Sequence, residues 1–274
     1  MSGLISTSSA STVVKWNAGS LIRKVFWPAL MGAVILLAWD RAIVMTENTL
    51  LPRPLQVVTG IGELAREGLL HRYVLASLFR VSWGFFLAAL IGIPLGLLMG
   101  WFAGVNDAMN PLIQFMRPIS PIAWIPLAII WFGLSEQGPV FLIFLSSVFP
   151  ITVSAAAAVK NIQPVYVRAA RNFGISGVEL FRRVILPATL PQILTGLRIA
   201  LGIAWLVVVA AEMVVTDARI GGLGYLIMDA RNAGSRYDLV VAGMVIIGVI
   251  GLMLDLLVRR LENFDEIRWG TGGR

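Results

Sequence analysis

The stretch from Tyr73 to Phe102 reads YVLASLFRVSWGFFLAALIGIPLGLLMGWF, and it decides the fold class. Arg80 is its single charged residue. A helix of about 20 apolar residues crosses the hydrocarbon core of a bilayer, so this stretch is long enough to span. A glycine recurs at every fourth position, a spacing that lets two helix backbones approach closely in lipid. We interpret these glycines, Gly92, Gly96 and Gly100, as a packing surface, and we expect Pro94 to kink the helix.

The composition of the whole chain agrees with a membrane setting. Of 274 residues, 58% are hydrophobic and 14% are charged, whereas soluble domains average about 25% charged residues. The mean hydropathy is +0.84. The net charge of +7 is scattered between apolar runs, which favours contact with anionic lipid over binding of nucleic acid.

The same composition excludes several chemistries. Cysteine is absent and there is one histidine, so we expect no disulfide, no thiol catalysis and no metal site on this chain. None of the three lysines follows a Gly-rich phosphate-binding loop, so we expect this chain not to hydrolyse ATP.

Outward from the first stretch, further apolar runs predict an all-α, polytopic membrane protein with six transmembrane helices. The predicted spans are about 25–44, 74–102, 119–134, 138–159, 190–216 and 239–258. The membrane domain is then 25–258, between an N-terminal segment, 1–24, and a charged tail, 259–274. The first run could instead be a signal peptide, but no small-residue cleavage site follows it.

The intervals between the runs differ in character. We predict a loop over 103–118 and a longer loop, 160–189, between spans four and five. Residues 45–73 are polar but contain apolar residues at helical spacing, which predicts a short amphipathic helix at the membrane surface. These apolar residues are Val57, Val58, Ile61, Leu64 and Ala65.

Prolines and aromatic residues suggest where a translocation path would lie. The third span holds Pro121 and Pro126, and a helix with two interior prolines is broken or kinked. Interrupted helices in transporters often line the path, because their freed backbone groups need partners. Trp124 is the best aromatic candidate for the path, although Trp124, Trp131 and Trp205 could each pack in the core or lie in an interfacial belt.

Charges inside spans need a partner or a water-filled cavity. Arg80 and Glu212 lie at similar depth near the same side of the membrane, so we predict that they are paired or share a polar vestibule. The guanidinium of Arg80 would also suit an oxyanion. Arg198 and Asp255 could form a second pair, and all four side chains could instead extend to the interface.

Lysine and arginine counts orient the predicted spans. Both termini lie on one side, together with 103–118 and 160–189, and that side carries 13 Lys and Arg against seven on the other. The positive-inside rule therefore places both termini and the 160–189 loop in the cytoplasm.

The 160–189 loop contains two short helical segments. Val167 to Gly174 predicts a helix ended by its glycine, and Gly177 to Arg183 predicts a second one, ended by the run from Val184 to Pro187. Small residues would allow another surface to dock closely, and basic residues would surround the contact. A hairpin lying on acidic lipid fits the composition equally well.

This loop resembles the cytoplasmic loop of permease subunits of ATP-binding-cassette (ABC) importers. The family pattern is Glu-Ala-Ala, three residues, Gly, nine residues, then Ile-x-Leu-Pro. Here Ala169-Ala170, Gly174 and Val184-Ile185-Leu186-Pro187 fall in register, whereas Arg168 stands at the usual Glu position, so no ionic role is transferred to it. From about Leu51 onward the chain is similar to the nitrate, sulfonate and taurine group of these permeases. The stretches that carry this similarity are Ser77-Leu78-Phe79-Arg80, Arg117-Pro118-Ile119-Ser120-Pro121, Trp131-Phe132-Gly133 and Gly196-Leu197-Arg198.

The resemblance implies a non-catalytic permease subunit that forms the path for a small oxyanion across the cell inner membrane. It implies a homodimer, two ATPase subunits that hold ATP and Mg, and a periplasmic or lipid-anchored substrate-binding protein. No cofactor is implied on this chain itself. The expected ATPase-coupling residues are Ala169, Ala170, Arg171, Gly174, Val184, Leu186 and Pro187. The candidate translocation-path residues are Arg80, Pro121, Trp124, Pro126 and Glu212.

Two other classes of protein are less well supported. A secondary transporter or channel would act without an ATPase, and such carriers often contain inverted repeats, which are not evident here. A membrane-embedded enzyme would need a cluster of catalytic groups, and the carboxylates here are scattered. The substrate stays open among nitrate, bicarbonate, taurine, alkanesulfonates and a neutral or cationic small molecule.

Overall fold

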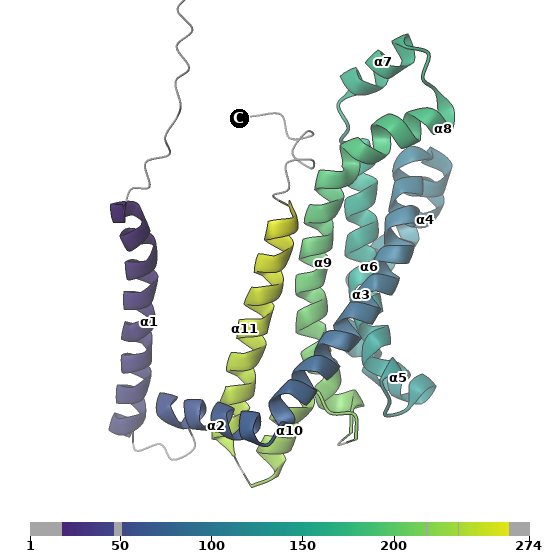
Figure 1. The fold of residues 1–274 in the computed structure, drawn as a ribbon. Coiled ribbons are helices and arrows are strands. Elements are labelled where there is room, and N and C mark those ends of the chain that lie inside the picture. Colours follow the sequence, from purple (N-terminus) through teal and green to yellow (C-terminus); the bar gives the residue numbers. More distant parts are fainter. Residues whose placement is uncertain (1–17, 47–50, 218, 235, 263–274) are drawn as a thin grey trace, which may run out of the picture. The chain divides into compact units, whose positions relative to one another are not determined.

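The computed structural model describes residues 18–46, 51–217, 219–234 and 236–262, and every regular element within them is a helix (Figure 1). The chain divides into two units, Met1–Pro54 and Leu55–Arg274. In the first unit, α1 spans Ala18–Thr46 and contains Pro28. Most of the predicted N-terminal segment and most of the tail, residues 1–17 and 263–274, lie outside the described residues.

The second unit contains the remaining helices. Five helices of the described chain, α1 among them, are long and apolar enough to cross a membrane. An all-α, polytopic membrane fold is therefore confirmed. The elements are α2 (Pro54–Arg66), α3 (Leu69–Trp101), α4 (Ala103–Met116), the 3₁₀ turn η1 (Pro121–Trp124), α5 (Ile125–Phe132), α6 (Gln137–Lys160), α7 (Pro164–Asn172), α8 (Gly177–Leu180), the π turn η2 (Phe181–Ile185), α9 (Leu186–Val215), α10 (Leu223–Asn232) and α11 (Tyr237–Glu262).

The glycines of α3 form the packing surface that their spacing predicts. The α3–α6 pair is the most extensive helix contact in the unit. A Cβ atom added at Gly96 would lie 2.6 Å from the Cβ of Ala155, and one at Gly100 would lie 2.5 Å from the Cβ of Val159. Because carbon atoms normally meet at about 3.5–4.0 Å, larger residues would force the two helices apart. The α3 helix continues through Pro94.

The predicted loop at 103–118 is wrong, because most of it is helix α4. Val105, Met109 and Ile113 recur four residues apart and pack with Met99 and Ala156. Polar residues near the start of the helix concealed this stripe; one of them, Asn106, accepts a 2.6 Å hydrogen bond from Lys160 Nζ.

The predicted third span, 119–134, is correspondingly too long. Its helical part consists of η1 and α5, and the eight residues of α5 reach only about 12 Å. The stretches Ala103–Met116 and Pro121–Phe132 together satisfy the length and composition of a crossing, but they are bent by 85° at the break between them. Counted as one broken span, this pair brings the number of candidate crossings to six.

A predicted helix end near Pro187 is also wrong. The segment beginning at Gly177 continues through η2 into α9 as one apolar helical stretch that ends at Val215. A proline inside a regular α-helix clashes with the carbonyl four residues earlier. The wider π turn at Phe181–Ile185, in which Leu186 N–H bonds to the carbonyl of Phe181, accommodates Pro187 without ending the helix.

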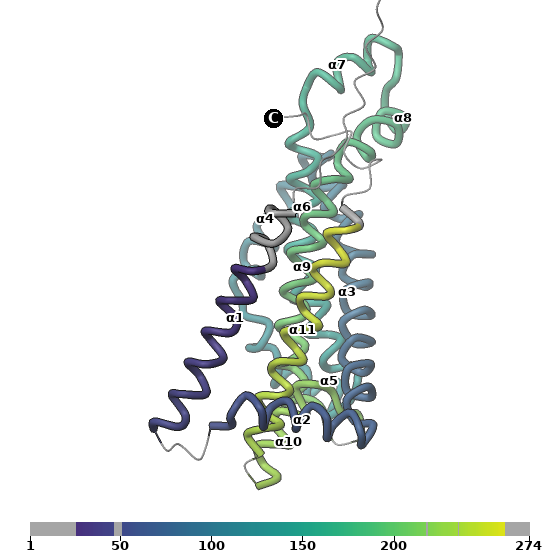
Figure 2. Tube along the Cα trace, turned by 60° about the vertical axis from the view of Figure 1, so that its left-hand side comes forward, coloured from purple at the N-terminus to yellow at the C-terminus, as the bar shows by residue number. Residues whose placement is uncertain are grey.

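Two sets of short elements lie at opposite ends of α9. The helices α7 and α8 precede it, whereas α10 follows it, and Figure 2 shows α2 running crosswise near α10. The predicted amphipathic helix is thus present as α2, with Val57, Gly60 and Leu64 buried. Arg236 joins α2 to the start of α11 through a 2.7 Å ion pair with Glu63. This hydrogen-bonded guanidinium lowers the pKa of the Glu63 carboxyl from its usual value.

Candidate functional site

The segment between α6 and α9, which we call the 164–187 loop, has a regular, hydrogen-bonded structure. Gly174 has φ of +78° and follows the end of α7. Ile175 N–H bonds to the Ala170 carbonyl at 3.0 Å, and Gly174 N–H bonds to the Arg171 carbonyl at 2.9 Å. These are the two bonds of a Schellman motif, which confirms the helix ending that the glycine predicts.

The loop is anchored by its own apolar core. Ala170, Leu180 and Ile185 are buried together with Leu97 of α3, Val159 of α6 and Ile193 of α9. The rings of Trp101 and Phe181 meet edge to face at a centroid distance of 5.8 Å. A displacement of the loop would therefore act directly on three membrane helices.

The loop exposes two large apolar side chains among charged and polar ones. Phe173 is 85% exposed and Val178 is 83% exposed. Of the seven residues predicted for ATPase coupling, Ala170 and Val184 point into the loop core, and the others are exposed. Large apolar side chains that are this exposed and have polar neighbours are candidates for an interaction surface.

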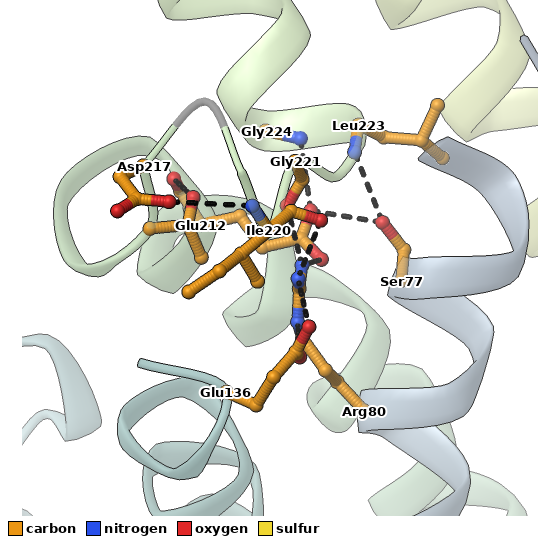
Figure 3. A network of polar contacts seen from close by, with 10 residues as sticks. Ser77, Arg80, Glu136, Glu212, Asp217, Ile220, Gly221, Leu223 and Gly224 are labelled. Carbon is orange, nitrogen blue, oxygen red and sulfur yellow. Dashed lines mark hydrogen bonds and ion pairs between the residues drawn. The ribbon is translucent and has the colours of Figure 1, made fainter. Parts of the chain in front are cut away.

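At the other end of α9, Arg80 and Glu212 form an ion pair, which confirms that they are close (Figure 3). Both side chains are fully buried, and Arg80 Nη1 lies 2.5 Å from Glu212 Oε1. Glu212 Oε2 also accepts hydrogen bonds from Ser77 Oγ at 2.9 Å and from Gly224 N at 3.0 Å. Ser77 in turn accepts a bond from Leu223 N.

A second carboxylate, which the sequence analysis missed, completes this network. Glu136 contacts Arg80 at Nε, 2.5 Å, and at Nη2, 3.1 Å. The remaining contacts of Arg80 are with the carbonyls of Ile220 and Gly221. A guanidinium has five N–H donors, so the groups around Arg80 use its full capacity. Glu136 lies between two apolar runs at the same end as Arg80 and Glu212, which was the available sequence signal.

The second predicted pair is also present. Arg198 Nε donates to Asp255 Oδ1 at 2.8 Å, and Asp255 also pairs with Arg259 at 2.9 Å. These groups are partly exposed, in contrast to Arg80 and Glu212. Arg198 lies near the middle of α9, so its partial exposure is combined with a paired carboxylate, as expected for a charge inside a span.

A cavity of about 350 Å³ lies where α4 and η1 are broken apart. Pro121 and Trp124, both predicted for the translocation path, line it, whereas Arg80, Pro126 and Glu212 do not. The other lining residues are Met116, Arg117, Ile119, Leu145, Ser146, Phe149, Pro150, Val153, Ser154, Ile199 and Ile203.

Of the remaining tryptophan candidates, Trp205 packs in the core, whereas Trp131 is 55% exposed. Trp205 is buried and donates from Nε1 to the carbonyl of Ile247 at 3.1 Å. Trp131 packs edge to face with Phe132 and Phe141. In residues 18–46, 51–217, 219–234 and 236–262, no three His, Asp or Glu side chains come together as a possible metal site.

The fold defines a polytopic helical membrane protein whose 164–187 loop is packed against three of the long helices. The family described as "Binding-protein-dependent transport system inner membrane component" matches residues 92–264. The chain belongs to this family.

Three curated relatives share much of the sequence. The taurine transport system permease protein TauC of Escherichia coli is 37% identical over 270 residues, covering 96% of each chain. The bicarbonate transport system permease protein CmpB of Synechococcus elongatus is 38% identical and covers 79% of this chain and 81% of its own. The nitrate import permease protein NrtB of Leptolyngbya laminosa is 36% identical and covers 91% of each.

Solved structures share the fold. The MetNI methionine ABC transporter in an inward-facing conformation matches with a TM-score of 0.63 at 19% identity, covering 74% of this chain and 97% of that one. A bacterial alginate ABC transporter in complex with a pentasaccharide-bound periplasmic protein matches with a TM-score of 0.61 at 15% identity, covering 94% and 99%. The chain is therefore an ABC importer permease of the nitrate, taurine and bicarbonate type.

Proposed function

We propose that this permease forms the translocation path for a small oxyanion, and that partner ATPases drive it by gripping the 164–187 loop. The observation that carries the proposal is the combination of two exposed apolar side chains, Phe173 and Val178, with a buried core that ties the loop to three membrane helices. The relatives are named for taurine, bicarbonate and nitrate, each of which presents negatively charged oxygen atoms.

The packing supports a mechanical route from loop to path. Ile185 and Ile193 belong to the helical stretch that becomes α9, and Val159 ends α6. Both α6 and α9 line the cavity at the α4–η1 break. Because packed helices move as rigid bodies, a force applied to Phe173 would shift two walls of this cavity. ATP and Mg would be held by the partner chains.

The proposed orientation is unchanged when 103–116 is taken as helix α4 and not as a loop. Arg117 then lies about 21 Å along the axis of this 14-residue helix, so it is left out of the count of Lys and Arg at the membrane surface. Without it, the side that carries both termini and the 164–187 loop has twelve Lys and Arg, against seven on the other side. The excess still favours a cytoplasmic position for that side. The binding protein and a second copy of this chain would complete the importer.

Phe173→Asp is expected to weaken binding of the ATPase at least tenfold, because a charged group replaces an apolar anchor and such anchors contribute about 2 kcal/mol or more. Phe173→Leu keeps an apolar side chain and is the matched control. Gly174 is a poorer target, since its φ of +78° would strain any other residue. The measurements are ATPase copurification and ATP-dependent uptake in proteoliposomes.

Unchanged ATPase binding and uptake in Phe173→Asp would contradict the proposed role of the loop. Uptake by the purified chain alone, without an ATPase, would instead support the secondary transporter. For the substrate class, binding measurements on the partner binding protein with nitrate, bicarbonate and taurine decide between oxyanions and other small molecules.

A further inference from the structure

The positively charged residue first expected to attract an oxyanion has no capacity to do so. Arg80 is fully buried, and its five N–H groups already face two carboxylates and two backbone carbonyls. Two carboxylates also outweigh its single charge. An anion would have to displace Glu136 or Glu212, so Arg80 holds the structure together at this end of α9 and leaves the recognition of substrate to another group.

Arg117 is the arginine that remains available. Arg80 and Arg198 are both paired with carboxylates. Arg117 is exposed, and within the described part of the chain its side chain has no hydrogen bond or ion pair, although its backbone N–H bonds to the carbonyl of Ile113 at 2.9 Å. An arginine at membrane depth is costly unless water, an anion or a partner chain meets it.

The cavity that Arg117 lines lies halfway along the crossing helices. The lining residues of α6 run from Leu145 to Ser154, in the middle of Gln137–Lys160. Those of α9, Ile199 and Ile203, are near the middle of Leu186–Val215. Substrate sites of transporters commonly lie at this depth, beside interrupted helices, and here the interruption is the 85° bend between α4 and η1.

The polar groups of the lining suit an anion. The lining contains one positive charge and no carboxylate. Trp124 Nε1 is a donor only, and neither it nor Ser154 Oγ has a hydrogen-bond partner among the residues that the structure describes. Ser146 already donates to the carbonyl of Ile143 at 2.8 Å, so it offers only its oxygen.

We propose that this central cavity binds the transported oxyanion, with Arg117 supplying the charge and Trp124 and Ser154 donating hydrogen bonds. The proposal rests on the proposed function and adds the binding site within the path. Planar nitrate or bicarbonate and the tetrahedral sulfonate of taurine share this chemistry, since a guanidinium fork bonds paired oxygens in each. The apolar wall of Phe149, Ile199 and Ile203 faces the same space and would separate the ion from lipid.

The absence of cysteine from the sequence gives a direct test. Ser154→Cys introduces a single thiol into the cavity lining with little change in volume. The purified chain is treated with an anionic methanethiosulfonate reagent that carries a sulfonate, and separately with its cationic ammonium counterpart. We expect the anionic reagent to react about tenfold faster than the cationic one, because a charge in a low-dielectric cavity concentrates its counter-ion. Nitrate, bicarbonate or taurine, tested in turn, should slow the labelling and so identify which ion fits.

Two further variants assign the effect to Arg117. In the Ser154→Cys background, Arg117→Gln should remove the preference for the anionic reagent and Arg117→Lys should retain part of it, whereas Arg66→Gln on the exposed face of α2 should leave it intact. A thiol introduced by Val178→Cys on the 164–187 loop is the control for reagent quality, and oxyanions should not protect it.

Three results would overturn the proposal: equal rates for the two reagents, lack of protection by all three ions, or labelling at Val178→Cys with none at Ser154→Cys. Because the reaction needs only the purified chain, it is independent of ATPase binding. Selective labelling together with failed ATPase docking would refute the driven importer and leave the anion cavity in place. ATP-driven oxyanion uptake that is unchanged by Arg117→Gln would refute the cavity and leave the importer in place.

Discussion

Gly96→Leu is expected to destabilise the α3–α6 pair by about 3 kcal/mol or more. At this position a single added Cβ would already lie 2.6 Å from the Cβ of Ala155 and 3.1 Å from the backbone nitrogen of Ala156. Backbone atoms cannot rotate away as the end of a flexible side chain can. The two helices must therefore separate, and lipid offers no hydrophobic force to bring them back together.

The measurement is the free energy of unfolding of the purified chain in mixed micelles. Gly248→Leu in α11 is the matched control, because a Cβ there would meet nothing within 4 Å. We expect that change to stay within about 0.5 kcal/mol of the parent protein. Gly96→Ala should fall between the two. Equal stabilities for Gly96→Leu and Gly248→Leu would show that α3 and α6 do not pack as described.

The long apolar helices were predictable because lipid imposes a simple rule on sequence. A run of about 20 apolar residues has few alternatives to a spanning helix, so α3, α6, α9 and α11 were all anticipated close to their observed positions. The glycine spacing in α3 was equally informative, since small residues four apart place two backbones in contact.

Elements shaped by their neighbours were harder to predict. The helix α4 contains Asn106, Asp107, Asn110 and Pro111, which locally favour a turn, and it forms because Val105, Met109 and Ile113 find a surface on α3 and α6. Likewise the run at Val184–Pro187 indicates a helix end until the π turn before it is known. In both places tertiary packing outweighs local preference.

The candidate site was predicted in part for the same reason. The closeness of Arg80 and Glu212 followed from their matching depth in two spans. The saturation of the Arg80 N–H donors by Glu136 and by the carbonyls of Ile220 and Gly221 depends on how the turn before α10 folds back, and hydrophobic periodicity does not predict that turn. Arg117 was assigned to a loop, and its place in the central cavity became visible only once α4 was known to be a helix.

Arg80→Ala is expected to lower the free energy of unfolding by about 3–5 kcal/mol, because it leaves the buried carboxylate of Glu212 without its counter-ion. Ser77 and Gly224 would still donate to Glu212, but neither carries a charge. Arg198→Ala is the comparison, since its partner Asp255 is 37% exposed and can be solvated when the pair is broken. A clearly smaller loss is expected there. The double variant Arg80→Ala/Glu212→Ala should lose less than the sum of the two single changes.

Gly222→Ala tests the same network without removing any charge. Gly222 has φ of +133°, and an added Cβ would lie 2.5 Å from Arg80 Nη1 and 2.5 Å from Glu212 Cδ. The backbone of this turn therefore lies so close to the ion pair, and in such a conformation, that only glycine fits at this position. We expect Gly222→Ala to be clearly destabilising, and the combined variant to lose less than the sum of the two single changes, because removing Arg80 relieves one clash of the added Cβ while the contact with Glu212 and the strained φ remain. Fully additive losses in the combined variant, measured in the same unfolding assay, would show that the turn and the ion pair are independent and that Arg80 does not anchor α10.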